Sequence, residues 1–174
     1  MDKETFKKLI RNIPDFPKAG IQFKDITTAL KDAECLQWLK SEIVDLYKGK
    51  GITQVVGLES RGFILGPAVA MEIGAGFVPE RKPGKLPAET VELSYKKEYG
   101  TDTMQIHKDA LTADDVVLIH DDLLATGGTA AAAIRLVKQM GVRKIYANFL
   151  IELKELNGRE LIDKDVEITS LIEF

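Results

Sequence analysis

Residues 116–129 read VVLIHDDLLATGGT, an apolar run followed by two carboxylates and a glycine-rich turn. A short apolar run bounded by turn residues is typical of a buried parallel strand, so we predict a strand over 116–119. Ligands bind open α/β sheets where strands end, which is where Asp121 and Asp122 stand. The glycines and the following helix-forming tract, residues 130–137, favour a bound phosphate. Hydroxyl-binding carboxylates beside a phosphate cradle indicate a sugar phosphate as the ligand.

Composition excludes several classes of protein. The 174 residues are 45% hydrophobic, which predicts one folded domain over residues 1–174. The 24 basic and 27 acidic residues give a net charge of −3, so we expect no nucleic-acid partner. Cys35 is the single cysteine, which excludes an internal disulfide. We find no apolar segment of membrane-spanning length and no signal region in the charged N-terminus, and we therefore expect no membrane partner and a cytoplasmic location.

Strand-like and helix-like segments alternate along the chain, which predicts an α/β fold with a mainly parallel sheet flanked by helices. Residues 1–30 and 80–107 exceed a minimal sheet of this kind, and we expect substrate specificity to reside there. A prolyl turn is predicted over residues 13–20. We predict helices over 4–11, between Asp32 and Gly49, over 62–73 and over 130–140, and strands over 53–58, 76–78, 91–95, 103–106, 116–119, 145–150 and 168–172.

The stretch DDLLATGGT, residues 121–129, resembles the phosphoribosyl-diphosphate signature of type I phosphoribosyltransferases, in the form found in the adenine-specific members. The resemblance runs from about residue 10 to residue 174. It implies the fold of that family, with an N-terminal hood (residues 1–30) and a flexible lid hairpin (residues 80–107). It also implies transfer of the 5-phosphoribosyl group from phosphoribosyl diphosphate to adenine, giving AMP and diphosphate in purine salvage, with Mg²⁺ as cofactor and a homodimer as the assembly.

In this interpretation Asp121 and Asp122 accept hydrogen bonds from the ribose hydroxyls. They support Mg²⁺ indirectly, through water or those hydroxyls. The alternative for such a pair is a solvated turn, which the flanking apolar run and glycines disfavour. The loop lacks the lysine of a Walker A motif, which disfavours an ATPase. The expected 5′-phosphate cradle consists of Ala125, Thr126, Gly127, Gly128 and Thr129.

A second motif, ESRG at residues 59–62, ends a predicted strand and begins a helix. Arg61 would therefore project into the same crevice, where its fork of donors suits diphosphate oxygens. The alternative is a surface arginine beside a helix cap at Ser60. The segment 57–63 resembles the diphosphate loop of the family, which carries a cis peptide, and the resemblance locates that peptide at Glu59–Ser60.

The basic loop after residue 80 suits a lid that carries positive charge towards a leaving diphosphate. Its expected substrate-binding residues are Arg81, Lys82 and Lys85, and the alternative is a solvated basic loop. By resemblance, Glu98 handles the proton at N7 of adenine and the adjoining Tyr99 binds substrate. The alternative for Glu98 is an ordinary surface carboxylate in a hairpin.

The segment 16–26 resembles the family's hood over the base. Phe23 would stack on the purine, backbone groups around Gln22 would recognise its 6-amino edge, and Leu153 would pack from the other side. For Phe23 the alternative is a core position. Two residues are unusual: Glu80 stands where an apolar residue is ordinary, and His120, where valine is usual, is interpreted as filling a strand end.

Two other functions compete with this interpretation. One is transfer to a different base, since base choice depends on backbone contacts. The other is a non-catalytic sensor of phosphoribosyl diphosphate, which would carry a DNA-binding extension and a degraded lid. We find neither a helix-turn-helix segment nor a basic face, and the lid motif is intact.

Overall fold

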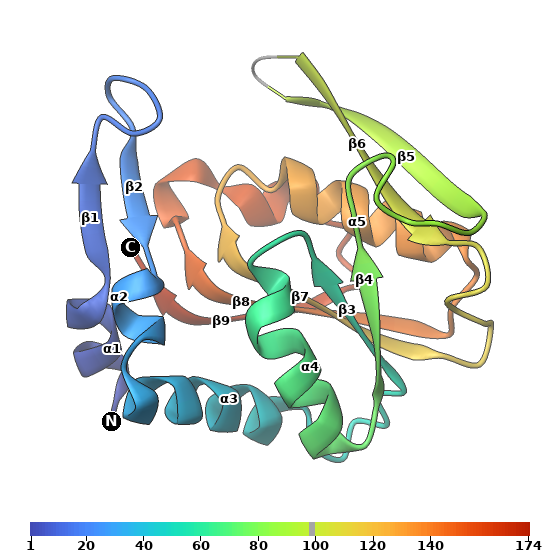
Figure 1. Cartoon of the computed structure of the whole chain (residues 1–174), viewed down its shortest axis with the longest axis horizontal. Helices are drawn as coiled ribbons and strands as arrows, with labels where there is room; N and C mark the ends of the chain where they lie inside the picture. The colour runs from blue at the N-terminus through green and yellow to red at the C-terminus, as the bar shows by residue number, and fades with distance from the viewer. Residues whose placement is uncertain (98–99) are drawn as a thin grey trace. The chain divides into compact units, whose positions relative to one another are not determined.

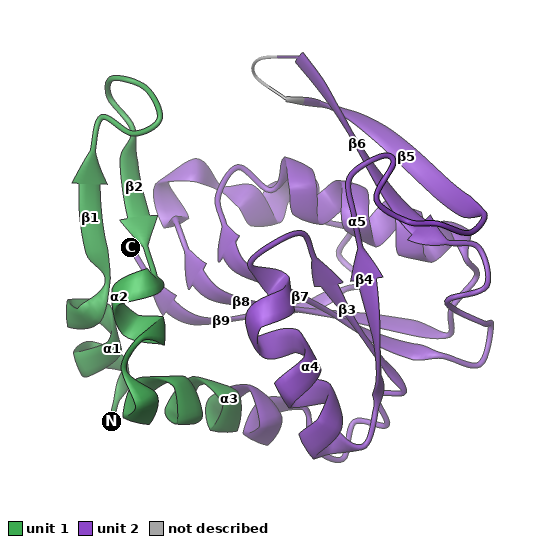
Figure 2. Ribbon diagram, viewed as in Figure 1, with its two compact units in different colours: residues 1–42 green, residues 43–174 purple. Residues whose placement is uncertain are grey.

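The computed structural model describes residues 1–97 and 100–174, and they form two compact units. Figure 2 shows the first unit, residues 1–42, and the second, residues 43–174. The single domain expected from chain length stays a prediction.

A five-stranded parallel sheet is the centre of the second unit, in the order β4-β3-β7-β8-β9 (Figure 1). The apolar runs of the sequence form these strands, because strands buried on both faces need little polar alternation. This confirms the α/β class with a parallel sheet flanked by helices. The strands are β3 (Gln54–Leu58), β4 (Gly76–Glu80), β7 (Val116–Leu124), β8 (Lys144–Glu152) and β9 (Glu167–Glu173).

Helices cover both faces of this sheet. Figure 1 shows α4 (Gly62–Ile73) and α5 (Gly128–Gln139) on opposite sides of the strands. Side chains alternate between the faces of a strand. Val56 and Ile119 therefore pack with α5 in the main core cluster, on what we term the α5 face. The residues between them, such as His120, belong to the opposite side, which we term the α4 face.

An antiparallel hairpin extends the α5 face. Its strands are β5 (Thr90–Lys97) and β6 (Gly100–His107), and Tyr95 lies opposite Asp102 in their register. Met104 and Ile106 of this hairpin are buried in the same core cluster as α5. Residues 80–107, predicted as an insertion, thus contribute core side chains as well as a loop.

The first unit contains α1 (Lys3–Leu9), the antiparallel pair β1 (Arg11–Pro14) and β2 (Gln22–Asp25), α2 (Thr27–Leu30) and most of α3 (Ala33–Tyr47). The Asp32 side chain accepts a hydrogen bond from the Cys35 N–H at 2.8 Å and so caps the helix that was predicted between Asp32 and Gly49. The β1-β2 pair was not predicted from the sequence. Its register is fixed by pairing and by an Arg11–Asp25 ion pair at 2.5 Å.

The largest difference from prediction is the length of β7. The predicted strand ends at Ile119, but the real strand continues to Leu124 because its pairing with β8 continues through Asp121, Leu123 and Leu124. The two carboxylates are therefore part of the strand and do not follow it. In the described part of the chain, no helix has both the length and the apolar character needed to cross a membrane.

Candidate active site

Asp121 and Asp122 lie near the carboxyl end of β7 on opposite faces of the sheet, because successive strand residues alternate. The Asp122 N–H donates to Asp121 Oδ1 at 2.9 Å. Asp122 is 2% exposed and lies on the α4 face. Asp121 lies on the α5 face, where it lines a cavity. The two adjacent aspartates thus have different surroundings.

Asp122 is paired with a cation. Arg61 Nε lies 2.7 Å from Asp122 Oδ2, so the structure brings together two residues that the sequence assigned to one crevice. Burial raises the pKa of Asp122, and the Arg61 charge offsets part of this rise. The Glu59–Ser60 peptide before Arg61 is cis, as predicted from the resemblance.

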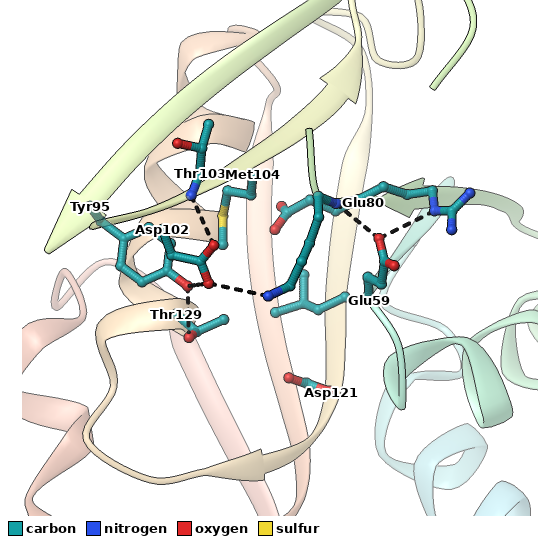
Figure 3. Close-up of a pocket in the computed structure, with 11 residues that line it drawn as sticks. Glu59, Glu80, Tyr95, Asp102, Thr103, Met104, Asp121 and Thr129 are labelled. Atoms are coloured by element: carbon teal, nitrogen blue, oxygen red, sulfur yellow. Dashed lines mark hydrogen bonds and ion pairs between the residues drawn. The ribbon is translucent and has the colours of Figure 1, made fainter. Parts of the chain in front are cut away.

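A cavity of about 190 Å³ lies on the α5 face over the ends of β4, β3 and β7 (Figure 3). This is smaller than the roughly 300–1,000 Å³ of typical ligand pockets, so it fits part of a nucleotide-sized substrate. Its lining residues come from the strand ends, the hairpin and α5, and they are Leu58, Glu59, Glu80, Arg81, Lys82, Tyr95, Asp102, Thr103, Met104, Asp121 and Thr129.

The basic residues of the cavity wall are held by carboxylates. Glu59 accepts hydrogen bonds from the Lys82 N–H at 2.9 Å and from Arg81 Nε at 3.3 Å, which fixes the start of the basic loop. Lys82 Nζ lies 3.5 Å from Asp102 Oδ2 on the hairpin. Lys85 is exposed, and its carbonyl accepts a hydrogen bond from Arg81 Nη1 at 3.5 Å. Arg81 and Lys82 line the same cavity as Asp121.

Glu80 is the unusual member of this wall. It is 2% exposed, and its Oε2 has no hydrogen-bond partner in the described structure. Burial, followed by the negative charge of Asp121, raises the pKa of Glu80 to about 8. Burial and the charge of Asp122 raise the pKa of Asp121 well above its ordinary value. A cavity wall with two such carboxyls favours a ligand that supplies cations or hydrogen-bond donors.

The predicted phosphate loop connects β7 to α5, and its two central glycines differ. Gly127 has a φ of +85°, a conformation that few other residues adopt. Gly128 has no such φ, and a Cβ there would meet nothing within 4 Å. Neither fold nor packing requires glycine at 128, but an approaching ligand would need that open space. The first-turn N–H groups of α5 have no intrahelical partners and suit an anion.

The hairpin contacts this loop. Tyr95 Oη lies 3.0 Å from Thr129 Oγ1 and 3.4 Å from Asp102 Oδ2 (Figure 3). Sequence reasoning missed Tyr95, Asp102 and Glu59 as neighbours of the site. For Tyr95 and Asp102 the available signal was the alternation of the two hairpin strands, which puts both residues at the end of a mainly apolar row that packs on the core. Glu59 was part of the ESRG motif, but only Arg61 was taken from that motif as a site residue.

The carboxylates at the cavity fit a magnesium ion that a bound substrate helps to coordinate. Among the described residues, no three or more His, Cys, Asp or Glu side chains are grouped to hold a metal. Mg²⁺ usually binds one or two carboxylates together with waters and substrate phosphates. Asp121 and the unpartnered oxygen of Glu80 offer hard oxygen ligands at one cavity. The site therefore fits Mg²⁺ that is shared with a phosphorylated substrate.

Three other predicted residues belong to two different units. Gln22 is exposed and half-buried Phe23 follows it on β2 in the first unit, where its ring lies edge-on to Phe16 with centroids 5.2 Å apart. Leu153 is half-buried and follows β8 in the second unit. The base site that these three residues would form together stays a prediction. Two further predicted residues, Glu98 and Tyr99, lie outside the described residues.

Comparison with known proteins agrees with this geometry. The family model described as "Phosphoribosyl transferase domain" matches residues 27–173. An adenine phosphoribosyltransferase of Bacteroides thetaiotaomicron is 62% identical over 99% of this chain and 98% of its own length. The crystal structure of the Thermoanaerobacter pseudethanolicus enzyme is 48% identical, with a TM-score of 0.93 over 99% of both chains.

The enzyme from Giardia lamblia, solved with 9-deazaadenine, is 44% identical and has a TM-score of 0.95 over 100% of this chain and 98% of its own. These likenesses extend over the whole chain, including the strand ends that carry the carboxylates. The chain therefore belongs to the phosphoribosyltransferase family, among its adenine phosphoribosyltransferases.

Proposed function

We propose that the chain transfers the 5-phosphoribosyl group of phosphoribosyl diphosphate to adenine, giving AMP and diphosphate in purine salvage. One observation carries the proposal: adjacent carboxylates, a glycine-rich loop before a helix, and basic side chains meet at the strand ends of one sheet. The relative from Giardia lamblia was solved with an adenine analogue, which supports adenine as the base.

In this proposal the loop of residues 125–129 holds the 5′-phosphate through its backbone N–H groups and the Thr126 and Thr129 hydroxyls. Asp121 and Asp122 accept hydrogen bonds from the ribose hydroxyls from the two sides of β7. Since both carboxyls are held by the strand and not by a loose turn, they fix the sugar relative to the sheet.

Diphosphate leaves C1′ as positive charge develops on the ribose. Arg61, Arg81, Lys82 and Lys85 would neutralise the departing oxygens, and Arg61 is already oriented by Asp122. Lys82, which lies beside Asp102, would exchange that carboxylate for a diphosphate oxygen. Mg²⁺, when bound, supplies further positive charge to the diphosphate.

The base-binding part of the proposal rests on the family resemblance. Phe23 and Leu153 would sandwich the purine, backbone groups around Gln22 would recognise the 6-amino group, and Tyr99 would bind substrate. Glu98 would exchange the proton at N7, which offsets charge on the base as the N9–C1′ bond forms.

A homodimer and a cytoplasmic location belong to the same proposal. Helix α4 supports the dimer because it is apolar around most of its circumference, with Ile64 45% and Met71 76% exposed. A helix of this composition favours a covered position, and a second copy would cover it. Light scattering should therefore report twice the chain mass, and a monomer at micromolar concentration would contradict the assembly.

The decisive test is a diphosphate-release assay with phosphoribosyl diphosphate, Mg²⁺ and each nucleobase separately. We expect release with adenine alone, together with AMP. Release with another base would keep the mechanism and overturn the base assignment. Binding of phosphoribosyl diphosphate without release for any base would favour the sensor function.

The phosphate loop has its own test in Gly128→Ala. A methyl group at 128 meets no protein atom within 4 Å, so stability should change by less than about 1 kcal/mol. The same methyl would occupy space that the phosphate needs, and the KM for phosphoribosyl diphosphate should rise about tenfold or more. An unchanged KM would place the phosphate elsewhere.

A further inference from the structure

The segment after β8 packs backbone to backbone on the phosphate loop. It forms two short 3₁₀ turns, over residues 154–156 and 158–161. A Cβ on Gly127 would lie 2.1 Å from the Gly158 carbonyl oxygen, and a Cβ on Gly158 would lie 2.3 Å from the Ala125 carbonyl oxygen. Both distances are far inside van der Waals contact, so this approach requires glycine on both sides. Gly158 thus supports the centre of the loop directly.

Arg159, the next residue, fixes this segment to the sheet. Its Nε and Nη2 donate to the two carboxylate oxygens of Glu152, each at 2.7 Å. Glu152 is 5% exposed and also accepts a hydrogen bond from Ser170 Oγ at 2.7 Å. Arg159 Nη1 donates to the Ile168 carbonyl at 3.2 Å. A bidentate arginine–carboxylate pair holds its two side chains in one orientation, whereas a lysine, which makes a single contact, does not.

Glu152, the partner of Arg159, also lies beside the residue at which the phosphate loop begins. Glu152 lies opposite Leu124 in the β7-β8 register, and the loop begins immediately after Leu124. The Leu153 N–H donates to the Leu124 carbonyl at 2.9 Å. Strand pairing therefore holds the loop where it begins, after Leu124, and Gly158 holds it at its centre. The Arg159–Glu152 ion pair connects these two contacts.

We propose that Gly158 and Arg159 are positioning residues that preorganise the phosphate loop for the 5′-phosphate. The inference rests on the proposed function, which assigns that phosphate to residues 125–129. A loop already held in its binding shape loses little conformational freedom when the anion arrives. Neither residue needs to touch the ligand, since both act through the backbone of Ala125 and Gly127.

The test compares Gly158→Ala and Arg159→Lys with a matched control, Lys50→Met. Lys50 pairs with Glu167 at the opposite end of β9, so the control removes an ion pair from the same sheet far from the loop. Calorimetry would measure binding of ribose 5-phosphate, which carries the 5′-phosphate, and of magnesium diphosphate, which does not. Thermal unfolding would verify that each variant is folded.

We expect Gly158→Ala to weaken ribose 5-phosphate binding tenfold or more and Arg159→Lys to weaken it about threefold to tenfold. Diphosphate binding should stay within twofold, and the KM for phosphoribosyl diphosphate should rise more than kcat falls. Lys50→Met should change neither ligand. Parallel losses for both ligands, or an unchanged ribose 5-phosphate affinity in folded Arg159→Lys, would overturn the inference. Failure of the unmutated protein to bind ribose 5-phosphate would instead overturn the phosphate assignment of the proposed function.

Discussion

The two faces of the central sheet bury polar groups in opposite ways. On the α4 face, the buried polar side-chain atoms that the structure describes near the strand ends all have partners. Asp122 pairs with Arg61, and His120 Nδ1 lies 3.0 Å from Asn148 Oδ1. The Asn148 amide donates to Thr169 Oγ1 at 2.9 Å, which continues the chain of hydrogen bonds across β7, β8 and β9. This chain of residues is the buried polar network of the α4 face.

On the α5 face the corresponding carboxyls are less completely paired. Glu80 Oε2 makes no hydrogen bond in the described structure, and Asp121 faces the cavity beside it. Leaving a buried polar atom unpaired costs roughly 1–3 kcal/mol, and a folded protein retains that cost where a ligand will supply the partner. The α4 face therefore holds its buried polar groups already paired, whereas the α5 face leaves a carboxyl oxygen unpaired beside the cavity, where a ligand would supply the partner.

The double variant Asp121→Asn with Asp122→Asn should have the largest effect. Each lost charge-assisted hydrogen bond to ribose is worth about 1.5–3 kcal/mol, so activity should fall about 10²–10⁴-fold with the fold retained. Steady-state kinetics and circular dichroism measure the two properties. Full turnover in the folded variant would remove both carboxylates from the ribose site.

The single variants sharpen the comparison between the faces. Asp121→Asn removes a buried carboxyl with a raised pKa and should leave stability unchanged or higher. Asp122→Asn also removes a buried carboxyl with a raised pKa, but it takes away the charge that pairs with Arg61, so its free energy of unfolding should lie about 1–3 kcal/mol below that of Asp121→Asn. Equal stability losses in the two variants would mean that the carboxyl groups on the two faces contribute equally to the free energy of unfolding.

A variant of Asn148 disrupts the polar network of the α4 face at its centre. Asn148→Leu removes the partner of both His120 and Thr169 and should cost about 2–4 kcal/mol of unfolding free energy. Guanidinium unfolding measures the change. Asn12→Leu, at an exposed strand position, is the control and should stay within about 0.5 kcal/mol. A similar small change for Asn148→Leu would mean that the network is dispensable.

A further prediction concerns Glu80, whose pKa of about 8 in the folded chain lies above its ordinary value of 4.5. Between these two pH values the folded chain binds more protons than the unfolded chain, so its stability falls as pH rises. Glu80→Gln cannot lose a proton, and the difference in unfolding free energy between the variant and the original chain should grow from pH 5 to pH 8. A constant difference would show that Glu80 already ionises freely.

Much of the fold could be predicted because its signals are local. Helix α4 was placed at residues 62–73, where glycine begins an apolar tract, and the structure has the same bounds. The extent of β7 could not be predicted, because aspartate disfavours strands and the pairing with β8 that overrides this preference comes from residues over 20 positions away. The β1-β2 pair was missed because its strands, RNIP and QFKD, are short and mostly polar and contain no apolar run.

The sequence identified residues of the site, but it did not predict that they lie on opposite faces of the sheet. The motifs identified Asp121, Asp122 and Arg61, and the structure pairs the last two. The sequence does not reveal that Asp121 faces a different set of neighbours, since this depends on the phase of the strand. The contact between Gly158 and Gly127 joins segments about 30 residues apart, so no local pattern announces it.

His120 provides the last and smallest test, because its titration should oppose that of Glu80. Burial lowers the pKa of His120 to about 4, below its ordinary 6.5, although the hydrogen bond to Asn148 acts in the other direction. Between pH 4 and 6.5 the unfolded chain therefore takes up a proton that the folded chain does not, and stability rises with pH. His120→Gln keeps an amide that can pair with Asn148 but cannot titrate. Its unfolding free energy, measured in guanidinium, should lose less than that of the original chain as pH falls from 6.5 to 4. Equal losses would mean that His120 accepts a proton in the folded chain, and the α4 face would then be less completely paired than its hydrogen bonds indicate.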